Sequence, residues 1–165
     1  MSPQILHRVL FGTTKPTPAQ SSRLTIRPAL LPRHTRHRVR FCDYPAILPT
    51  PSIPESSVRG TLVTGLTTTD LARLDLFEGE QYDRRWVDVH VLPSEGKEAN
   101  GGKGTGMDKA GESARCETYI WIAKREELEE REWDFDEFVR EKMRRWVGED
   151  KEYDGELRPS IRGML

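Results

Sequence analysis

Cysteine is scarce in this sequence, and its two copies, Cys42 and Cys116, lie far apart. Neither belongs to a C-x-x-C pair, and the four histidines show no metal-ligand spacing. The sequence therefore predicts no metal site, and no phosphate-binding or cofactor motif is visible. We expect both cysteines to be reduced residues that are small and buried or at the edge of a sheet.

Long apolar runs are also absent. No segment approaches the length of a membrane span, and no signal peptide is visible, so we expect a cytoplasmic protein without a membrane partner. Hydrophobic residues make up 35% of the 165 positions and charged residues 32%. This length is sufficient for one domain with its own core and a strongly solvated surface.

Acidic residues are almost missing from the first 45 positions. Eight of the 26 lysines and arginines lie there with one acid, Asp43, out of 27, which leaves 18 basic and 26 acidic residues for the remainder. Such a start is compatible with a mitochondrial presequence or a nucleic-acid contact surface. Five prolines interrupt any presequence helix. The stretch RHTRHRVRF has no interleaved aromatic residues, so it is more typical of a solvated strand face, and we expect no nucleic-acid partner.

Segments of alternating or β-branched pattern indicate strands separated by proline- and glycine-rich connections. A strand pattern closes on a Tyr-Pro turn at 35–47, and VRGTLVTGL at 58–66 is typical of a buried strand. WVDVHVL at 86–92 alternates as a half-buried strand, and ETYIWIA at 117–123 is its expected antiparallel partner. The intervening segment is rich in glycine and charge, which predicts a mobile insertion at 93–116.

Two helices are expected from capping signals and apolar spacing. The first is short, with a capping box of Thr67 and Asp70 and with Gly79 as its terminating residue. The second covers 134–147, where Asp134 begins an apolar stripe that favours core packing. These elements predict one domain over 1–147, followed by a polar tail at 148–165.

The carboxylate Glu78 stands at the end of the first helix, directly after Phe77. The negative end of a helix and partial desolvation both disfavour a charged carboxylate, so both would raise the pKa of Glu78. A raised pKa is what a carboxyl group needs to transfer protons near neutral pH. Arg84 and Arg85 could offset this. The residue pattern alone favours the simpler interpretation that Glu78 is a solvated charge at a helix end.

The longer pattern VRGTLVTGLTTTDLARLDLFEGEQYDRRWVDV resembles the gamma-glutamylcyclotransferase-like family, in the plant and fungal branch of avirulence-induced proteins. The family reads V-x-G, then L-D-x-F-E-G, E-x-Y-x-R and a valine-rich strand. The corresponding residues here include Gly60, the run from Leu74 to Gly79, Glu80, Tyr82 and Arg84. The stretch from Asp43 to Ala46 resembles the family's tyrosine-proline turn, and the likeness covers most of 4–150.

The resemblance implies an α+β fold, a small closed or partly closed mixed β-barrel with flanking helices. It implies that Glu78 is the general acid/base in an acyl transfer that cyclises a gamma-glutamyl group to 5-oxoproline and releases an amine, without metal or cofactor. The substrate is then a small gamma-glutamyl compound. Tyr44, Tyr82 and Arg84 are second-rank candidates for substrate binding. Each has a structural alternative: a turn, barrel packing, and a surface pair with Glu80 or Asp83.

The family's Tyr-Gly-Thr-Leu loop, which presents backbone N–H groups to the substrate carboxylate, is not found. Residues 4–12 resemble the segment that follows that loop, so we expect the chain to begin after the first strand. An alternative function is therefore an inactive barrel that binds a small ligand or a protein. The sequence does not name the substrate or the oligomeric state.

Overall fold

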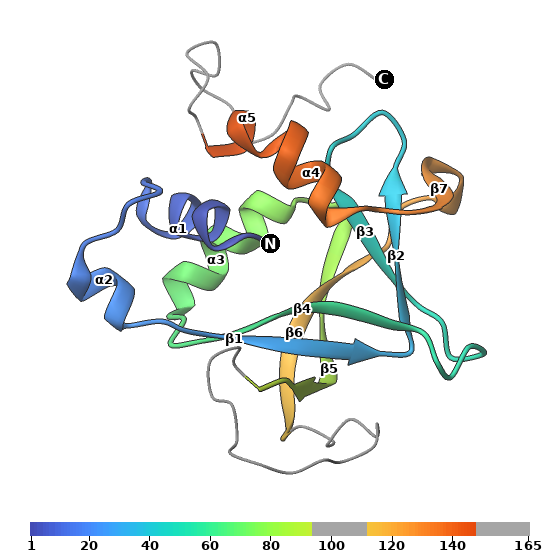
Figure 1. Ribbon diagram of the computed structural model, residues 1–165, viewed down its shortest axis with the longest axis horizontal. Helices are drawn as coiled ribbons and strands as arrows, with labels where there is room; N and C mark the ends of the chain where they lie inside the picture. The colour runs from blue at the N-terminus through green and yellow to red at the C-terminus, as the bar shows by residue number, and fades with distance from the viewer. Residues whose placement is uncertain (94–111, 148–165) are drawn as a thin grey trace, which may run out of the picture.

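Two antiparallel sheets and flanking helices form the fold of the computed structural model, which describes residues 1–93 and 112–147 (Figure 1). The larger sheet has the order β4-β1-β5-β6 and consists of β1 (Thr25–Pro32), β4 (Ser57–Thr64), β5 (Tyr82–Val91) and β6 (Ser113–Trp121). The smaller sheet has the order β3-β2-β7 and consists of β2 (His34–Val39), β3 (Pro45–Pro49) and β7 (Leu128–Glu132). The α+β prediction is confirmed. Within the described residues the two sheets do not join, which is compatible with a partly closed barrel.

The helices flank these sheets. They are α1 (Pro3–Phe11), α2 (Pro18–Ser22), α3 (Thr68–Glu78), the 3-10 turn η1 (Arg125–Glu127), α4 (Phe135–Glu141) and α5 (Met143–Val147). The sequence predicts no helix at α1, because prolines usually interrupt a helix. Pro3 is instead the first helical residue, where a missing N–H costs nothing, and Gly12, at φ +71°, ends the helix before the later prolines.

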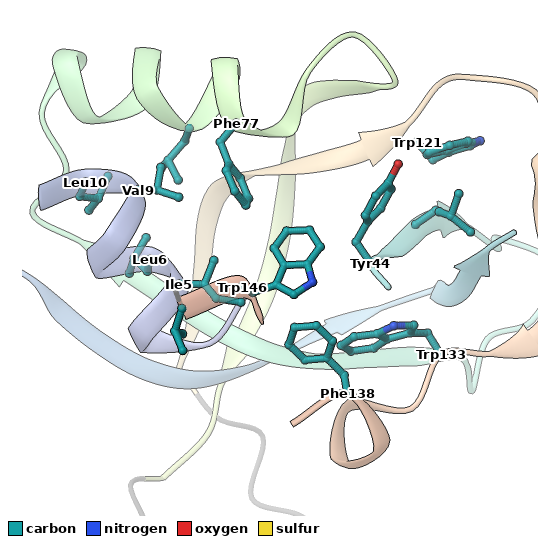
Figure 2. Close-up of a cluster of buried hydrophobic side chains, with 14 of the residues drawn as sticks. Ile5, Leu6, Val9, Leu10, Tyr44, Phe77, Trp121, Trp133, Phe138 and Trp146 are labelled. Carbon is teal, nitrogen blue, oxygen red and sulfur yellow. The ribbon is translucent and has the colours of Figure 1, made fainter. Parts of the chain in front are cut away.

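The main core lies between α1, α3, the last two helices and one end of the sheets. Figure 2 shows its aromatic side chains converging from these elements. Leu10 of α1 is fully buried, and Trp121 of β6 is 3% exposed. Each large apolar side chain buried in this way stabilises the fold by about 1.5–3 kcal/mol. A second, smaller cluster joins β1, β4 and β5.

The hairpin of β5 and β6 confirms the predicted pairing. Trp86 lies opposite Glu117, and the register continues as far as His90 opposite Ser113. At the far end, Val91 N donates a hydrogen bond to Glu112 O at 2.9 Å. The predicted insertion between these strands falls mostly outside the described residues.

The strand β4 is less buried than predicted. Among the described strands it pairs with β1 alone, at the edge of the larger sheet. Only Val58 and Leu62 are buried along it. An edge strand has a neighbour on one side only, so β-branched residues there can remain accessible although the sequence resembles a central strand.

The predicted single strand at 35–47 is wrong, because the chain reverses within it. The strands β2 and β3 form a hairpin in which Arg36 faces Ile47. Phe41, with φ +60°, lies in the connection and is 97% exposed. Pro45 then starts β3 rather than closing a turn.

The predicted single helix at 134–147 is also corrected. Asp134 caps α4 by accepting hydrogen bonds from the N–H groups of Asp136 (2.8 Å) and Glu137 (3.0 Å), but the helix stops at Lys142 and α5 follows. The rings of Phe138 and Trp146 are 6.1 Å apart. In a continuous helix, residues eight apart would lie about 12 Å apart along the axis, so the break lets both rings meet in the core.

Candidate active site

The helix α3 is fixed at its start by a capping box, as predicted. Thr67 Oγ1 accepts a hydrogen bond from Asp70 N at 3.2 Å, and Asp70 Oδ2 accepts one from Thr67 N at 2.8 Å. The Asp70 side chain is buried and also receives Arg23, with Nη1 2.5 Å from Oδ2. Burial opposes ionisation of Asp70, but the hydrogen bonds from Arg23 and Thr67 outweigh it and lower the pKa of the carboxyl to about 2.

The other end of α3 places Glu78. Leu74 and Phe77 are buried against the core, so the next residue, Glu78, lies half-buried at the boundary of the apolar side. Gly79, at φ +71°, ends the helix, and its N–H donates to Asp75 O at 2.9 Å. Residues with side chains rarely adopt this φ, which accounts for glycine directly after the candidate carboxylate.

Glu78 lies near the start of α1. The α-amine of Met1 is buried, and burial lowers its pKa. The Glu78 carboxylate opposes this shift and the Arg36 guanidinium adds to it, so both charges act on the same nitrogen. Figure 1 shows the N-terminus beside the end of α3.

A cluster of polar side chains, the Asp75 cluster, lies between α3 and the β5–β6 hairpin. Tyr119 Oη donates a hydrogen bond to Asp75 Oδ1 at 2.7 Å. Arg84 joins it with Nε 3.3 Å from Asp75 Oδ1 and Nη1 3.2 Å from Glu117 Oε2. Burial, the bond to Asp75 and the nearby charges of Asp75 and Glu78 raise the pKa of Tyr119, so its hydroxyl stays protonated.

The predicted residue Arg84 thus belongs to the Asp75 cluster, next to the helix that carries Glu78. The structural alternative for Arg84 was a surface pair with Glu80 or Asp83. Arg84 instead pairs with Asp75 and Glu117. Its neighbour Arg85 is the residue that pairs with Asp83, at 3.0 Å.

Tyr44 and Tyr82 both connect β3 to the turn after Glu78. Tyr44 is buried, and its Oη donates to Gln81 Oε1 at 3.3 Å. Tyr82 Oη donates to Pro45 O at 2.9 Å, and its ring packs edge-on against Trp121 at 5.2 Å. These contacts give both tyrosines a structural role close to the candidate site.

Trp146 of α5 covers the apolar side of this region. Its ring lies edge-on to Tyr44 and to Phe77, each at 6.1 Å between ring centroids. Figure 2 shows the indole between Phe77 and Tyr44, with Phe138 below it. The residue directly before Glu78 is therefore held by the last described helix.

A separate small pocket lies between β2, β7 and α4. Arg38, Asp43, Trp133 and Glu137 are among its lining residues, and Glu78 is not. Its volume of about 20 Å³ is sufficient for about one water molecule. This pocket is too small for a substrate and is not the candidate site.

Within 1–93 and 112–147, no group of three or more His, Cys, Asp or Glu side chains is arranged to hold a metal ion. Cys42 and Cys116 are free and partly buried. No helix in these same ranges has the length and apolarity that crossing a membrane requires.

Two residues near the site were missed by the sequence reading. The sequence pattern places Arg36 on a solvated strand face and Tyr119 in an ordinary strand. An arginine between Thr35 and His37 in a strand gives no local sign of burial. The alternation of ETYIWIA indicates the strand, but not that Tyr119 meets a helix 44 residues earlier in the sequence.

A family model described as "Gamma-glutamyl cyclotransferase, AIG2-like" matches residues 8–135. Among curated relatives from Arabidopsis thaliana, AIG2-like protein B is 32% identical over 72% of this chain and 58% of its own length. Protein AIG2 C is 30% identical over 67% of this chain and 56% of its own length. The chain thus spans less than three fifths of these two relatives.

A solution structure of an Arabidopsis thaliana protein has the same fold, with a TM-score of 0.55 and 23% identity over 100% of this chain and 87% of that one. The family match covers Glu78, the Asp75 cluster and Arg36. The chain belongs to the AIG2-like gamma-glutamyl cyclotransferase family.

Proposed function

We propose that this chain cyclises a gamma-glutamyl group to 5-oxoproline, with Glu78 as the general acid/base. The α-amine nitrogen attacks the γ-carbonyl carbon of its own residue, and Glu78 takes one proton from that nitrogen. The bond between the carbonyl carbon and the second amine breaks, and Glu78 returns the proton to the departing nitrogen. The reaction needs no cofactor, because ring closure is intramolecular and the protein only positions the chain and moves a proton.

The position of Glu78 carries this proposal. The carboxyl group is half-buried at the end of α3, and it acts electrostatically on a buried primary amine, the α-amine of Met1. Family membership supports the same assignment, because the family model covers this helix.

The residues around Glu78 would fix its position and would not transfer protons themselves. The Asp75 cluster ties α3 to the β5–β6 hairpin one turn before Glu78, through Arg84 and Tyr119. Tyr44 and Tyr82 hold the turn that follows it. We propose that these four side chains form the wall of the substrate site.

The test is 5-oxoproline release from a panel of gamma-glutamyl amino acids and amines. Glu78→Gln keeps the size of the side chain and removes proton transfer, so we expect release to fall by about 100-fold or more. Glu80→Gln is the matched control, because Glu80 is an exposed acid two residues away. Release that is equal in both variants would refute the role of Glu78.

A folded protein that releases no 5-oxoproline from any member of the panel would refute the enzymatic proposal. It would favour the alternative of a barrel that binds a small ligand or a protein partner. The same compounds would then be tested for binding by titration calorimetry. Binding would favour the small-ligand partner, and no binding would favour the protein partner.

A further inference from the structure

The Asp75 cluster has an uneven balance of charge. Its one cation, Arg84, lies between two carboxylates, with Nε 3.3 Å from Asp75 Oδ1 and Nη1 3.2 Å from Glu117 Oε2. Tyr119 Oη donates to Asp75 Oδ1 at 2.7 Å and adds no charge, because the raised pKa of Tyr119 keeps its hydroxyl protonated. Two carboxylates against one guanidinium leave the cluster with one net negative charge at neutral pH.

Glu78 is the neighbour of this cluster on α3. It follows Asp75 by three residues, a spacing that separates two helical side chains by about 60° around the axis and about 4.5 Å along it. Leu74, four residues before Glu78, is buried on the other flank. Glu78 therefore stands between the core and the Asp75 cluster. The negative charge of Glu78 is also one of those that raise the pKa of Tyr119, which agrees with this placement.

The charge of the cluster acts against ionisation of Glu78, because a carboxylate ionises less readily beside a negative charge that is not compensated. Solvent weakens the effect only in part, since the side chains of Arg84 and Glu117 are each 28% exposed and that of Asp75 is 45% exposed. Arg84 offsets one of the two carboxylates, so removing Arg84 and removing a carboxylate should act on Glu78 in opposite directions. A residue that only held α3 in place would not produce this reversal of sign.

Other charged groups also surround this end of α3. The α-amine of Met1, which precedes α1, and the Glu78 carboxylate interact as opposite charges, and the Arg36 guanidinium of β2 acts on the same amine. Glu80 and Asp83, in the segment after α3, are exposed acids. These groups stay unchanged when a residue of the Asp75 cluster is replaced, so a comparison with the wild type isolates the charge of the cluster.

We propose that the net negative charge of the Asp75 cluster tunes Glu78, so that its carboxyl holds a proton more readily than it would without the cluster. Asp75 and Glu117 are then positioning residues, which act through Glu78 and do not react themselves. This inference rests on the proposed function of Glu78 and adds how that carboxyl is adjusted to its task. A general acid/base is most effective when it gains and loses its proton near the working pH, and the cluster would move Glu78 towards that range.

The first test measures proton binding without turnover. The carboxyl carbon signal of Glu78, identified by its loss in Glu78→Gln, is followed by NMR against pH at low ionic strength, where charges are least screened. We expect Asp75→Asn and Glu117→Gln each to lower its titration midpoint by about 0.3 pH unit or more, and Arg84→Gln to raise it. Asp83→Asn, the matched control with a 52% exposed side chain, should move it by less than about 0.1 pH unit. A midpoint that stays in place in Asp75→Asn, or that moves in the same direction in Arg84→Gln, would overturn the proposal.

The second test measures the pH dependence of 5-oxoproline release. The acidic limb of kcat/KM reports the proton affinity of the base in the free enzyme, so it should move to lower pH in Asp75→Asn and to higher pH in Arg84→Gln. A limb that stays in place while the NMR midpoint moves would contradict the role of Glu78 as the base. If the midpoint moves as expected and no variant releases 5-oxoproline, the reaction proposed for Glu78 fails and the charge coupling stands. Normal release with a midpoint that does not move would overturn the coupling and leave the reaction in place.

Discussion

Replacing Asp70 by asparagine tests how strongly the start of α3 is anchored, and with it the position of Glu78. The pKa of Asp70 is about 2 in the folded protein, against an ordinary value of 3.8. The difference of about 1.8 corresponds to about 2.5 kcal/mol of stability at neutral pH. The side chain is only 4% exposed, so solvent screens little of this energy. Asparagine keeps the shape and removes the charge that Arg23 and Thr67 bind.

The pH dependence follows from the direction of the shift. A carboxyl whose pKa is lowered by folding stabilises the protein fully above its unfolded value and loses that contribution as the pH falls through its folded value. Between pH 6 and pH 3 the wild type should therefore lose about 1 kcal/mol more than Asp70→Asn. Other carboxylates titrate in both proteins, so their effects cancel in the difference.

The assay is urea denaturation of both proteins at pH 6 and pH 3, followed by circular dichroism. Asp83→Asn is the matched control, because Asp83 has a 52% exposed side chain and a surface pair with Arg85 that contributes little. A stability gap between wild type and Asp70→Asn that stays the same at both pH values would refute the reasoning. It would mean that the Arg23 and Thr67 contacts do not favour the ionised form.

Two further predictions concern backbone and core. Gly65→Ala should destabilise the fold by more than about 2 kcal/mol in thermal or urea unfolding, because φ is +89° and the new Cβ would lie 2.0 Å from Arg23 O. Gly60→Ala, where a Cβ meets nothing within 4 Å, should change stability by less than about 1 kcal/mol, and equal losses would contradict this account. Trp146→Ala should cost about 3–5 kcal/mol because Trp146 is 9% exposed, whereas Phe135→Ala, 38% exposed, should cost far less. A small loss from Trp146→Ala in the same urea assay would mean that α5 does not complete the core.

The helix that carries Glu78 could be predicted because its signals are local. Thr67 and Asp70 are three residues apart, and Gly79 marks the end by its own backbone freedom. The β5–β6 pairing was accessible for a similar reason, since alternation fixes which face of each strand is buried. The family resemblance then pointed to Glu78, which charge and spacing alone did not single out.

Contacts that depend on distant segments were not predictable in this way. Arg36 is partly buried because Trp133, almost one hundred positions later, stacks against it. The break at Lys142 allows the rings of Phe138 and Trp146 to meet. The residues next to the break include no proline or glycine that would predict it. The position of α1 was obscured because proline was read as a breaker, although at the first position of a helix it is favoured.

The β5–β6 hairpin has a consequence for protein engineering. Val91 and Glu112 bring the two ends of the intervening segment together, whatever that segment contains. Because β5 begins just after Glu78 and runs for 10 residues, its far end lies about 30 Å away along the strand. Doubling the length of a closed loop costs only about 0.6 kcal/mol, so a reporter or affinity tag can be inserted there while the end of the hairpin next to Glu78 stays untouched.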